Sequence, residues 1–372
     1  MPARLGALTK LTPHSKDRGF RVAVVGCGYW GSKHVRVLHA TEGVGEVVVV
    51  DSREDRARSL ARSYRSASWH DCLGPALDEV DAVVVATPPS THVAVALTAI
   101  EAGKHVLVEK PLAPTTAGAR LLDRAAAQAG VVLMVGHTFE YNPAVRKLRE
   151  LVQGGELGEV YYIDSARLNL GLYQNDVNVI LDLAPHDISI INHVLGRRPV
   201  AAQAWASRHA HRRFEDVAYL RLFYDDFFDD RGLSANIHVS WLDPCKVRRV
   251  TAVGSAKMAV YDDLAADERI KVLDKGVRLP EGGDLTQPPL SYRYGDIVVP
   301  YIAPDEPLAV QDRHFIDCIA TGARPLTDGE NGLAVVAALE AAELSRRLGR
   351  PVLLEELSND GRLLESRFAG AS

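Results

Sequence analysis

The 372-residue sequence has no apolar run of the roughly 18 residues or more that a membrane helix requires. Its longest apolar runs, near 46–50 and 82–86, have the length of a β-strand. It also lacks a strong charge of either sign, because 43 Lys and Arg against 48 Asp and Glu leave a net charge of −5. These absences exclude a membrane-embedded chain, a strongly basic nucleic-acid binder and a disordered acidic chain. We therefore expect neither a nucleic-acid nor a membrane partner.

Cysteine is scarce, and its spacing is uninformative for metal binding. The four cysteines lie far apart and form no C-x-x-C pair: Cys27, Cys72, Cys245 and Cys318. This pattern argues against a structural zinc site and against a disulfide framework, so no metal is expected. The first 18 residues hold no continuous apolar core of the kind a secretory signal needs. We interpret residues 1–18 as a disordered lead-in of a cytoplasmic protein.

Between residues 19 and 140, short strand-like runs alternate with helical patterns. The β-branched runs are apolar on both faces, as expected of strands buried in a parallel sheet; they occupy 21–25, 46–50, 82–86, 105–108 and 131–135. Helical patterns lie at 32–41, 53–63, 91–102 and 115–129. This alternation predicts an N-terminal α/β domain of the Rossmann type, with a doubly wound parallel sheet.

Residues 141–356 follow a different pattern. A helix is predicted at 143–153, and period-two alternation follows at 160–169, 200–207, 217–223, 234–241, 247–253 and 258–261. Two more helices are predicted at 307–321 and 330–348. The pattern predicts an α+β domain with an open, largely antiparallel sheet flanked by helices. Because the second face of such a sheet needs cover, we expect a homodimer or homotetramer; residues 357–372 are interpreted as a loose tail. We interpret the acidic run Asp225–Asp230 as a solvated hairpin tip rather than a cation site.

A glycine motif follows the first predicted strand and opens the next helix. It reads Gly26-Cys27-Gly28-Tyr29-Trp30-Gly31, and Asp51 ends the second strand 20 residues after Gly31. Such glycines allow a tight turn and let the backbone approach a pyrophosphate at a helix N-terminus. Asp51 at the strand end can accept hydrogen bonds from ribose hydroxyls, which favours NAD. Because Arg53 follows Ser52 and can instead hold a 2′-phosphate, NADP stays open.

Further candidate cofactor contacts follow the later strands. Thr87-Pro88-Pro89 leaves the run at 82–86, and His92 comes at the start of the next helix. Ligands bind at the carboxyl ends of strands in such sheets, which is where this stiff loop lies. A plain strand-to-helix turn is the alternative interpretation. The expected cofactor contacts also include Glu109, Lys110 and His137.

Glu109-Lys110-Pro111 follows the fifth strand immediately. A lysine next to proline on a rigid loop is held in one geometry, and an X-Pro bond can be cis. Lys110 can then act as a base, or hold a substrate hydroxyl and help to move its proton. Taken by itself, the tripeptide is also compatible with a surface turn.

Asp182 and His186 form a second candidate catalytic pair. Four residues apart, they share one face of a helix, and Pro185 is then expected in the first turn of that helix. A carboxylate that orients an imidazole is a standard proton-transfer pair. The alternatives are a helix N-cap for Asp182 and a packing role for His186. A metal site at His186 and Asp187 lacks a second His or Cys at ligand spacing.

Taken together, these motifs resemble the glucose–fructose oxidoreductase, inositol dehydrogenase and rhizopine-catabolism family (GFO/IDH/MocA). The order of the motifs matches over about residues 21–348. The resemblance implies an NAD(P)-dependent oxidoreductase with an N-terminal Rossmann domain. It also implies a C-terminal sheet that lines the substrate site and usually forms the dimer interface. By this resemblance Lys110 and His186 transfer protons and hold substrate, with Asp182 beside them.

Within the family, the sequence looks like the branch that handles nucleotide-linked sugars. The resemblance lies in Gly28-Tyr29-Trp30-Gly31, Asp182-Leu183-Ala184-Pro185-His186-Asp187, Ser240-Trp241-Leu242-Asp243-Pro244 and Gly295-Asp296-Ile297-Val298-Val299-Pro300. Such enzymes oxidise a ring hydroxyl, often at C-3, in amino-sugar, antibiotic or polysaccharide biosynthesis. The candidate substrate contacts are Lys110, Arg167, Tyr173, Asn178, Asp182, His186 and Arg293.

One departure and three alternatives accompany this interpretation. Family members often have a Gly-rich stretch before the Asp and a Gly before the His, where this sequence has 178–181 and Ala184-Pro185. The first alternative is a dehydrogenase of a free cyclitol or monosaccharide. The second is a lyase or glycoside hydrolase that recycles a tightly held NAD. The third is a non-catalytic NAD-binding regulator, which would need none of Lys110, Asp182 and His186.

Overall fold

The computed structural model describes residues 18–64, 67–171, 173–174, 176–210, 212–225, 232–278 and 291–358. The chain divides into two compact units, Met1–Thr138 with Glu306–Val336 and Phe139–Asp305 with Ala337–Ser372. Three expectations fall wholly or mostly outside the described residues: the lead-in at 1–18, the tail at 357–372 and the acidic run after Asp225.

The first unit contains a six-stranded sheet in the order β3-β2-β1-β4-β5-β6, with every neighbouring pair parallel. The strands are β1 Phe20–Val25, β2 Val44–Val50, β3 Ala67–His70, β4 Ala82–Val85, β5 His105–Glu109 and β6 Leu133–Gly136. Central strands such as Ala82–Val85 are buried throughout because helices cover both faces of the sheet. This strand order is that of the Rossmann fold, which confirms the predicted class.

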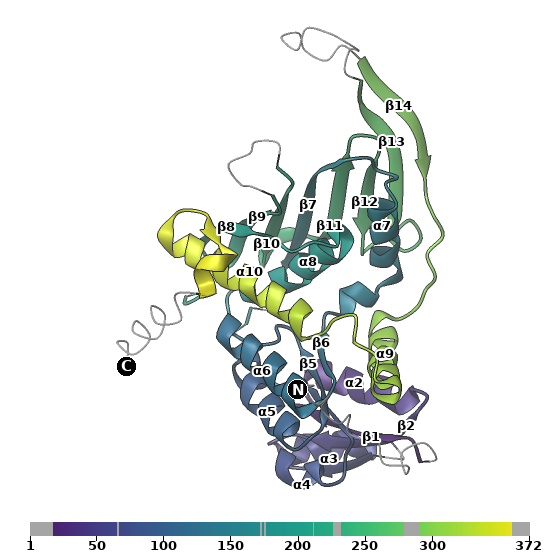
Figure 1. Cartoon of the computed structure of the whole chain (residues 1–372), viewed down its shortest axis with the longest axis vertical. Coiled ribbons are helices and arrows are strands. Elements are labelled where there is room, and N and C mark those ends of the chain that lie inside the picture. Colours follow the sequence, from purple (N-terminus) through teal and green to yellow (C-terminus); the bar gives the residue numbers. More distant parts are fainter. Residues whose placement is uncertain are drawn as a thin grey trace, which may run out of the picture. The chain divides into compact units, whose positions relative to one another are not determined.

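The helices of the first unit pack in pairs: α5 lies against α6, and α2 lies against α9 (Figure 1). The bounds are α2 Tyr29–Ala40, α3 Glu54–Arg62, α4 Leu73–Leu77, α5 Pro89–Glu101, α6 Thr116–Ala129 and α9 Pro307–Thr321. The hydroxyl of Thr115 accepts a hydrogen bond from the Gly118 amide at the start of α6, and Gly130 ends that helix in the left-handed conformation. The sequence pattern missed β3 and α4, because both are short and β3 has no buried apolar face.

The structure changes the domain assignment of one segment. The sequence pattern predicts 141–356 as one domain, whereas Glu306–Val336 belongs to the first unit. Two sets of contacts explain this. Asp312 of α9 pairs with the buried His34 of α2, and Thr327 bonds through its carbonyl and hydroxyl oxygens to the backbone of Val135 in β6. The chain therefore returns to the first unit near its C-terminal end, which local sequence patterns do not reveal.

The second unit contains a nine-stranded sheet in the order β14-β13-β12-β11-β7-β10-β9-β8-β15. Strands β7 and β10 run parallel; the other neighbouring pairs among the described strands are antiparallel, as predicted. The strands are β7 Val160–Leu170, β8 Ala201–Ser207, β9 Val217–Phe223, β10 Ser234–Ser240, β11 Leu242–Gly254, β12 Met258–Asp262, β13 Ile270–Arg278, β14 Ser291–Val298 and β15 Val352–Leu353. The sequence pattern missed β13, β14 and β15.

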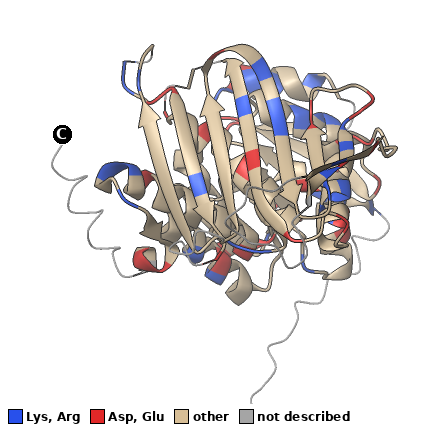
Figure 2. Ribbon diagram, turned by 90° about the horizontal axis from the view of Figure 1, so that it is seen from above, with Lys and Arg blue, Asp and Glu red and all other residues tan. Residues whose placement is uncertain are grey.

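Helices cover one face of this sheet, with α8 Val179–Leu195 packed on β7 and β10 and against α7 Pro143–Gln153. The remaining elements are η1 Thr138–Tyr141, α10 Gly329–Leu348, which crosses the boundary between the two units, and η2 Leu354–Ser358. Figure 2 shows that lysine and arginine are concentrated on strands toward one end of the sheet, while most other strands carry few charges. Within the described ranges, no helix is both long enough and apolar enough to cross a membrane.

Candidate active site

Five of the predicted motif positions lie where strands of the parallel sheet end. Gly26 follows β1, Asp51 follows β2, the Thr87 loop follows β4, Lys110 follows β5 and His137 follows β6. Because all six strands are parallel, their carboxyl ends share one edge. Ligands bind along this edge in doubly wound sheets. The sheet thus brings these separate sequence motifs to one edge of the first unit.

The three glycines of the first loop differ in what a side chain at each position would meet. Gly26 has φ +89°, and a Cβ there would meet the backbone of Ala86 at 2.8 Å. A Cβ on Gly31 would lie 1.8 Å from the carbonyl oxygen of Gly26. A Cβ on Gly28, in contrast, would meet nothing within 4 Å. Gly26 and Gly31 therefore close the turn, and Gly28 leaves open space at the N-terminus of α2, as close approach of a pyrophosphate requires.

Asp51 is buried and held in place at the end of β2. Its carboxylate accepts hydrogen bonds from the amides of Cys27 at 2.8 Å and Arg53 at 2.9 Å. The Arg56 guanidinium lies 3.5 Å from the same carboxylate. Arg53 is exposed and pairs with Asp55 at 3.0 Å. The carboxylate therefore links the glycine loop to the β2 end, beside two arginines.

Tyr29 and Trp30 begin α2 with exposed aromatic rings. The rings meet edge to face with centroids 5.6 Å apart, and the Lys33 ammonium lies 4.7 Å from the Tyr29 ring centroid. Ser52 is also exposed. These side chains are accessible at the same edge of the sheet as the glycine loop.

His92 joins two loops of the sheet edge. Its ring nitrogens lie 2.8 Å from the carbonyl oxygen of Pro111 and 2.8 Å from that of Thr87. Burial lowers the pKa of His92 despite these carbonyl contacts. Pro88 and Pro89 stand at the N-cap and first positions of α5, where a proline costs no hydrogen bond. The neutral imidazole has one N–H, so His92 donates to one of these carbonyls and packs between the Thr87 and Pro111 loops.

The Glu109-Lys110-Pro111 turn follows β5 and has a backbone contact from the Glu109 side chain. The Lys110–Pro111 peptide bond is cis, a geometry that the sequence analysis anticipates. Glu109 is buried, and its carboxylate accepts the backbone amide of Lys110 at 3.2 Å. His137 is buried just after β6.

The helix that carries Asp182 and His186 begins earlier than expected. Its N-cap is Asn178, whose side-chain oxygen accepts the Leu181 amide at 3.0 Å. The expectation that Pro185 lies in the first turn is wrong, because Pro185 lies inside α8. The N-cap alternative for Asp182 is excluded for the same reason. Because proline has no amide hydrogen, the helix lacks the bond from residue 185 to the Leu181 carbonyl.

Asp182 is oriented by a tryptophan that the sequence analysis did not connect with it. The indole Nε1–H of Trp241 donates to the Asp182 carboxylate at 3.0 Å, and Trp241 is buried just after β10. The Tyr173 ring lies 5.4 Å from the Trp241 ring. His186 packs edge to face against Phe139 at 5.1 Å. In the second unit, Asp182, Tyr173 and Trp241 therefore form one polar and aromatic group, and His186 follows Asp182 by four residues on α8.

Asp187 has two partners of its own. The buried Arg167 donates from Nε to its carboxylate at 2.6 Å, and the Ser165 hydroxyl donates at 2.6 Å. Burial disfavours the charge on Arg167, but the Asp187 carboxylate outweighs this and raises the pKa of Arg167. Among the described residues, no group of three or more His, Cys, Asp and Glu is placed to hold a metal ion. The ion pair accounts for Asp187, the residue on which a metal site beside His186 depended.

Two other candidate substrate contacts have structural partners in the second unit. Asn178 donates to Glu343 at 2.6 Å while it caps α8. Arg293, on β14, pairs with Asp274 of β13 at 2.7 Å. Both residues therefore stabilise local structure in this unit.

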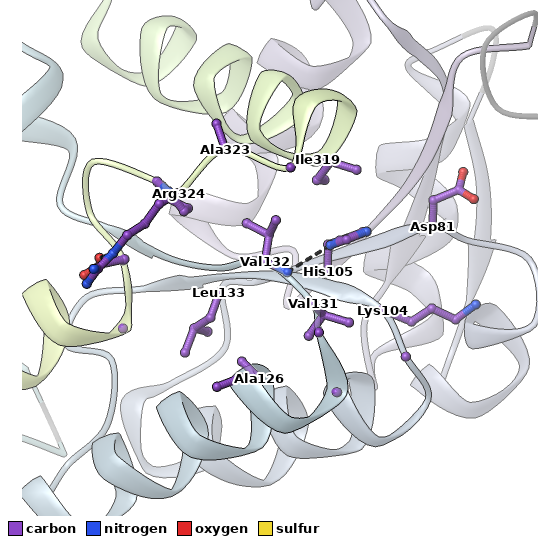
Figure 3. A pocket seen from close by; sticks show the side chains of 18 of the residues that line it. Asp81, Lys104, His105, Ala126, Val131, Val132, Leu133, Ile319, Ala323 and Arg324 are labelled. Atoms are coloured by element: carbon purple, nitrogen blue, oxygen red, sulfur yellow. Dashed lines mark hydrogen bonds and ion pairs between the residues drawn. The ribbon is translucent and has the colours of Figure 1, made fainter. Parts of the chain in front are cut away.

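A cavity of about 800 Å³ lies at the opposite edge of the first unit's sheet (Figure 3). Lys104 and His105 at the start of β5 and Leu133 at the start of β6 line it. Its charges include the exposed Arg324, which pairs with Asp328 and Glu330. The cavity is thus separated from the glycine loop and Lys110 by the length of the strands.

Comparison with known families agrees with this geometry. Residues 20–137 match the NAD-binding Rossmann-fold domain of the GFO/IDH/MocA oxidoreductases, and residues 145–260 match the C-terminal domain of the same family. The chain belongs to the GFO/IDH/MocA family. The prediction of an NAD(P)-dependent oxidoreductase is therefore confirmed.

Several curated GFO/IDH/MocA proteins are similar to the chain. D-apiose dehydrogenase of Paraburkholderia graminis is 26% identical over 95% of this chain and 94% of its own length. Inositol 2-dehydrogenase 2 of Saccharopolyspora erythraea is 34% identical, over 54% of this chain and 62% of that protein. UDP-N-acetylglucosamine 3-dehydrogenase of Acidithiobacillus ferrooxidans is 35% identical, over 50% of this chain and 57% of that protein.

Solved structures extend the likeness to nearly the whole chain. GenD2 from gentamicin A biosynthesis, in complex with NAD, is 28% identical with a TM-score of 0.74, over 92% of this chain and 99% of that chain. The A. ferrooxidans UDP-N-acetylglucosamine 3-dehydrogenase GnnA is 27% identical with a TM-score of 0.71, over 88% and 97% of the two chains.

We expect Trp241→Phe to lower kcat about tenfold or more, since a hydrogen bond to a charged group contributes about 1.5–3 kcal/mol. The substitution keeps an aromatic ring and removes the donor to Asp182. Steady-state kinetics with Tm as a folding check measures the effect. Trp69→Phe is the matched control, because Trp69 lies on β3, the edge strand of the first unit's sheet, and has no proposed role at the site. Equal kcat values for the two variants would contradict an orienting role for Trp241.

Proposed function

We propose that the protein is an NAD-dependent dehydrogenase that oxidises a secondary ring hydroxyl, at C-3, of a nucleotide-linked sugar. The observation that carries the proposal is the convergence of the glycine loop, Asp51, the Thr87 loop and Lys110 on one sheet edge. Its substrate class is supported by GnnA, a UDP-N-acetylglucosamine 3-dehydrogenase that is 27% identical over 88% of this chain. The biosynthetic role is supported by GenD2 from gentamicin A biosynthesis, which is 28% identical over 92% of this chain. Amino-sugar, antibiotic or polysaccharide biosynthesis is the corresponding role.

The proposal favours NAD over NADP. A 2′-phosphate at the end of β2 would face the buried carboxylate of Asp51, which is held by two backbone amides. The nearby Arg53 is occupied by Asp55. Ribose hydroxyls, in contrast, can donate to a carboxylate. The residues proposed to contact the cofactor are Gly26, Gly28, Tyr29, Trp30, Gly31, Asp51, Ser52, Arg53, Thr87, Pro88, Pro89, His92, Glu109, Lys110 and His137, with His92 and Glu109 acting through the loops that they hold.

Lys110, Asp182 and His186 are the proposed catalytic residues. The bound nicotinamide supplies the hydride acceptor. Lys110 or His186 takes the hydroxyl proton of the substrate, so that the carbon can become a ketone. The Asp182 carboxylate, which is held by Trp241, orients the His186 imidazole and stabilises its protonated form. Tyr173 is the proposed substrate contact that the geometry favours, because it lies beside Trp241; Arg167, Asn178 and Arg293 contribute through the local structure that they stabilise.

A second candidate is a dehydrogenase of a free monosaccharide or cyclitol. Its support is the D-apiose dehydrogenase of P. graminis, which matches nearly the full length of the chain. The inositol dehydrogenases add higher identity over about half of it. The two candidates differ in whether the enzyme binds the nucleoside diphosphate of its substrate.

We also propose a cytoplasmic homodimer or homotetramer. Trp205 and Tyr219 are 57% and 49% exposed on neighbouring strands of the nine-stranded sheet, and the His238 ring stacks on Tyr219 with centroids 4.0 Å apart. Such an aromatic row on a sheet face is typical of a protein interface.

The test is a thermal-shift and NADH-formation screen of the purified protein with NAD and NADP, each alone and with UDP-sugars, dTDP-sugars, free sugars or inositols. A ligand that binds only the folded state raises Tm in proportion to RT ln(1 + [L]/Kd). We expect a shift with NAD that grows with one nucleotide sugar, together with NADH formation. Turnover of free sugars or inositols alone would replace the first candidate by the second. A larger shift with NADP than with NAD would contradict the cofactor preference.

A further inference from the structure

A buried charged triad lies directly behind the Glu109-Lys110-Pro111 turn. His34 of α2 is fully buried between two carboxylates. Its Nε2 lies 3.0 Å from Glu109 at the end of β5, and its Nδ1 lies 2.9 Å from Asp312 of α9. Three elements that are distant in sequence therefore meet at one imidazole, and all three belong to the first unit.

Both ring nitrogens of His34 face a carboxyl group, and this favours the protonated imidazole. An ionised carboxylate accepts hydrogen bonds only, so each ring nitrogen must carry a hydrogen to bond with its carboxylate. Burial alone would lower the pKa of His34, but Asp312 and Glu109 outweigh it and raise that pKa to about 10. Burial alone would likewise raise the pKa of Glu109, which the contacts with His34 and Lys110 lower instead. At neutral pH the His34 imidazole between the Glu109 and Asp312 side chains is therefore protonated.

The Glu109 carboxylate connects this imidazolium to the lysine. One of its oxygens faces His34, and the other accepts the Lys110 backbone amide at 3.2 Å. Gly136 of β6 leaves room for the carboxylate, since a Cβ there would lie 2.9 Å from Glu109 Oε1. Asp312 is held in turn by Gln311, whose side-chain amide donates to it at 3.3 Å. Both oxygens of the Glu109 carboxylate therefore have a partner, His34 at Oε1 and the Lys110 amide at Oε2.

We propose that His34, held by Asp312, is a positioning residue for the reaction: it fixes the Glu109 carboxylate, which holds the Lys110 amide and so sets the direction in which the turn presents the lysine. The inference rests on the proposed catalytic role of Lys110. His34 lies on α2, the helix whose N-terminus follows the glycine loop. The triad thereby couples the placement of the proposed cofactor-phosphate site to that of the lysine.

Asp312→Asn tests the triad through its pH dependence. The variant leaves Glu109 as the single carboxylate facing His34, so His34 loses its proton at lower pH than in the wild type. We expect kcat of Asp312→Asn to stay within about threefold of the wild type at pH 6 and to fall by about tenfold relative to it at pH 9, with KM for NAD little changed. The free energy of unfolding of the wild type should likewise decrease at high pH, where His34 loses its proton. Because the folded pKa of His34 lies above 6.5, its stabilisation is complete below about pH 6.5 and is lost as the pH rises through about 10.

Two further variants separate positioning from helix packing. Gly136→Ala displaces the Glu109 carboxylate without removing a charge. We therefore expect it to lower kcat by the same factor at pH 6 as at pH 9, unlike Asp312→Asn. Glu306→Gln removes the exposed pair with Arg36, which also joins α2 and α9, and we expect its kcat to equal that of the wild type. A ratio of Asp312→Asn to wild-type kcat that is constant with pH and follows Tm would overturn the proposal.

The variant Lys110→Ala distinguishes a failure of the His34 proposal from a failure of the proposed function. If Lys110→Ala keeps its activity, the role of Lys110 is wrong and the positioning role falls with it. If Lys110→Ala is inactive while the ratio stays flat with pH, only the inference about His34 is wrong. The NMR signal of the Lys110 backbone amide provides a readout that needs no substrate: we expect it to move with pH in Asp312→Asn over a range in which it is constant in the wild type. An amide signal that is identical in both proteins at every pH would also overturn the proposal.

Discussion

Replacing Lys110 by alanine is expected to lower kcat by about 10²- to 10⁴-fold, the usual contribution of a positioned acid–base group. The lysine lies at the carboxyl edge of the parallel sheet, on a turn fixed by the Glu109 carboxylate. Its removal deletes one of the two proposed acceptors of the substrate hydroxyl proton and leaves the glycine loop and Asp51 intact. The dissociation constant of NAD should therefore change by no more than about threefold. Steady-state kinetics and a binding titration measure the two quantities.

A second lysine provides the control. Lys104 precedes the same strand at its opposite end and lines the cavity there, so Lys104→Ala should leave both kcat and NAD affinity unchanged. His186→Ala is expected to lower kcat in the same way as Lys110→Ala. Loss of activity with NAD affinity retained excludes a non-catalytic regulator. Normal turnover in both Lys110→Ala and His186→Ala would show that the proposed catalytic residues are wrong.

Replacing Gly31 by alanine is expected to lower Tm by about 2–12 °C, because overpacking against rigid structure typically costs about 1–3 kcal/mol. The new Cβ would lie 1.8 Å from the Gly26 carbonyl oxygen, and a backbone atom cannot move aside as a flexible side chain can. The loop must open, which also displaces the N-terminus of α2. NAD affinity should therefore fall together with stability. Thermal unfolding with and without NAD measures both effects.

Two other glycines separate the steric effect from the effect on the ligand. Gly28→Ala adds a Cβ that meets nothing within 4 Å, so we expect an unchanged Tm without ligand and a weaker NAD-induced shift. A Cβ added at Gly74, in α4, would also meet nothing within 4 Å, and Gly74→Ala should be neutral or slightly stabilising. A Gly31→Ala protein as stable as Gly74→Ala would refute the close approach of Gly31 to Gly26.

The fold class and most of the elements could be predicted from sequence patterns. Buried strands such as Ala82–Val85 and alternating strands such as Val217–Phe223 have periodicities that local physics imposes, since a strand covered on two faces must be apolar on both. The glycine motif was predictable because the turn leaves no space for a Cβ at Gly26 and Gly31. Asp51 was predictable from its place at the end of the second strand, 20 residues after Gly31. Short or weakly patterned elements such as β3 were not, because four partly buried residues give no periodic signal.

Which distant residues meet depended on the packing of the folded chain. Nothing near His34 in the sequence indicates Glu109 or Asp312, yet the imidazole contacts both. The partner of Asp182 is Trp241, on another element, and α8 begins at Val179 because Asn178 caps it, which places Pro185 inside the helix. The physical reason is common to these cases. Periodicity and turn chemistry act within a few neighbouring residues, whereas a buried charge or indole selects its partner from whatever the packed elements bring within hydrogen-bond distance.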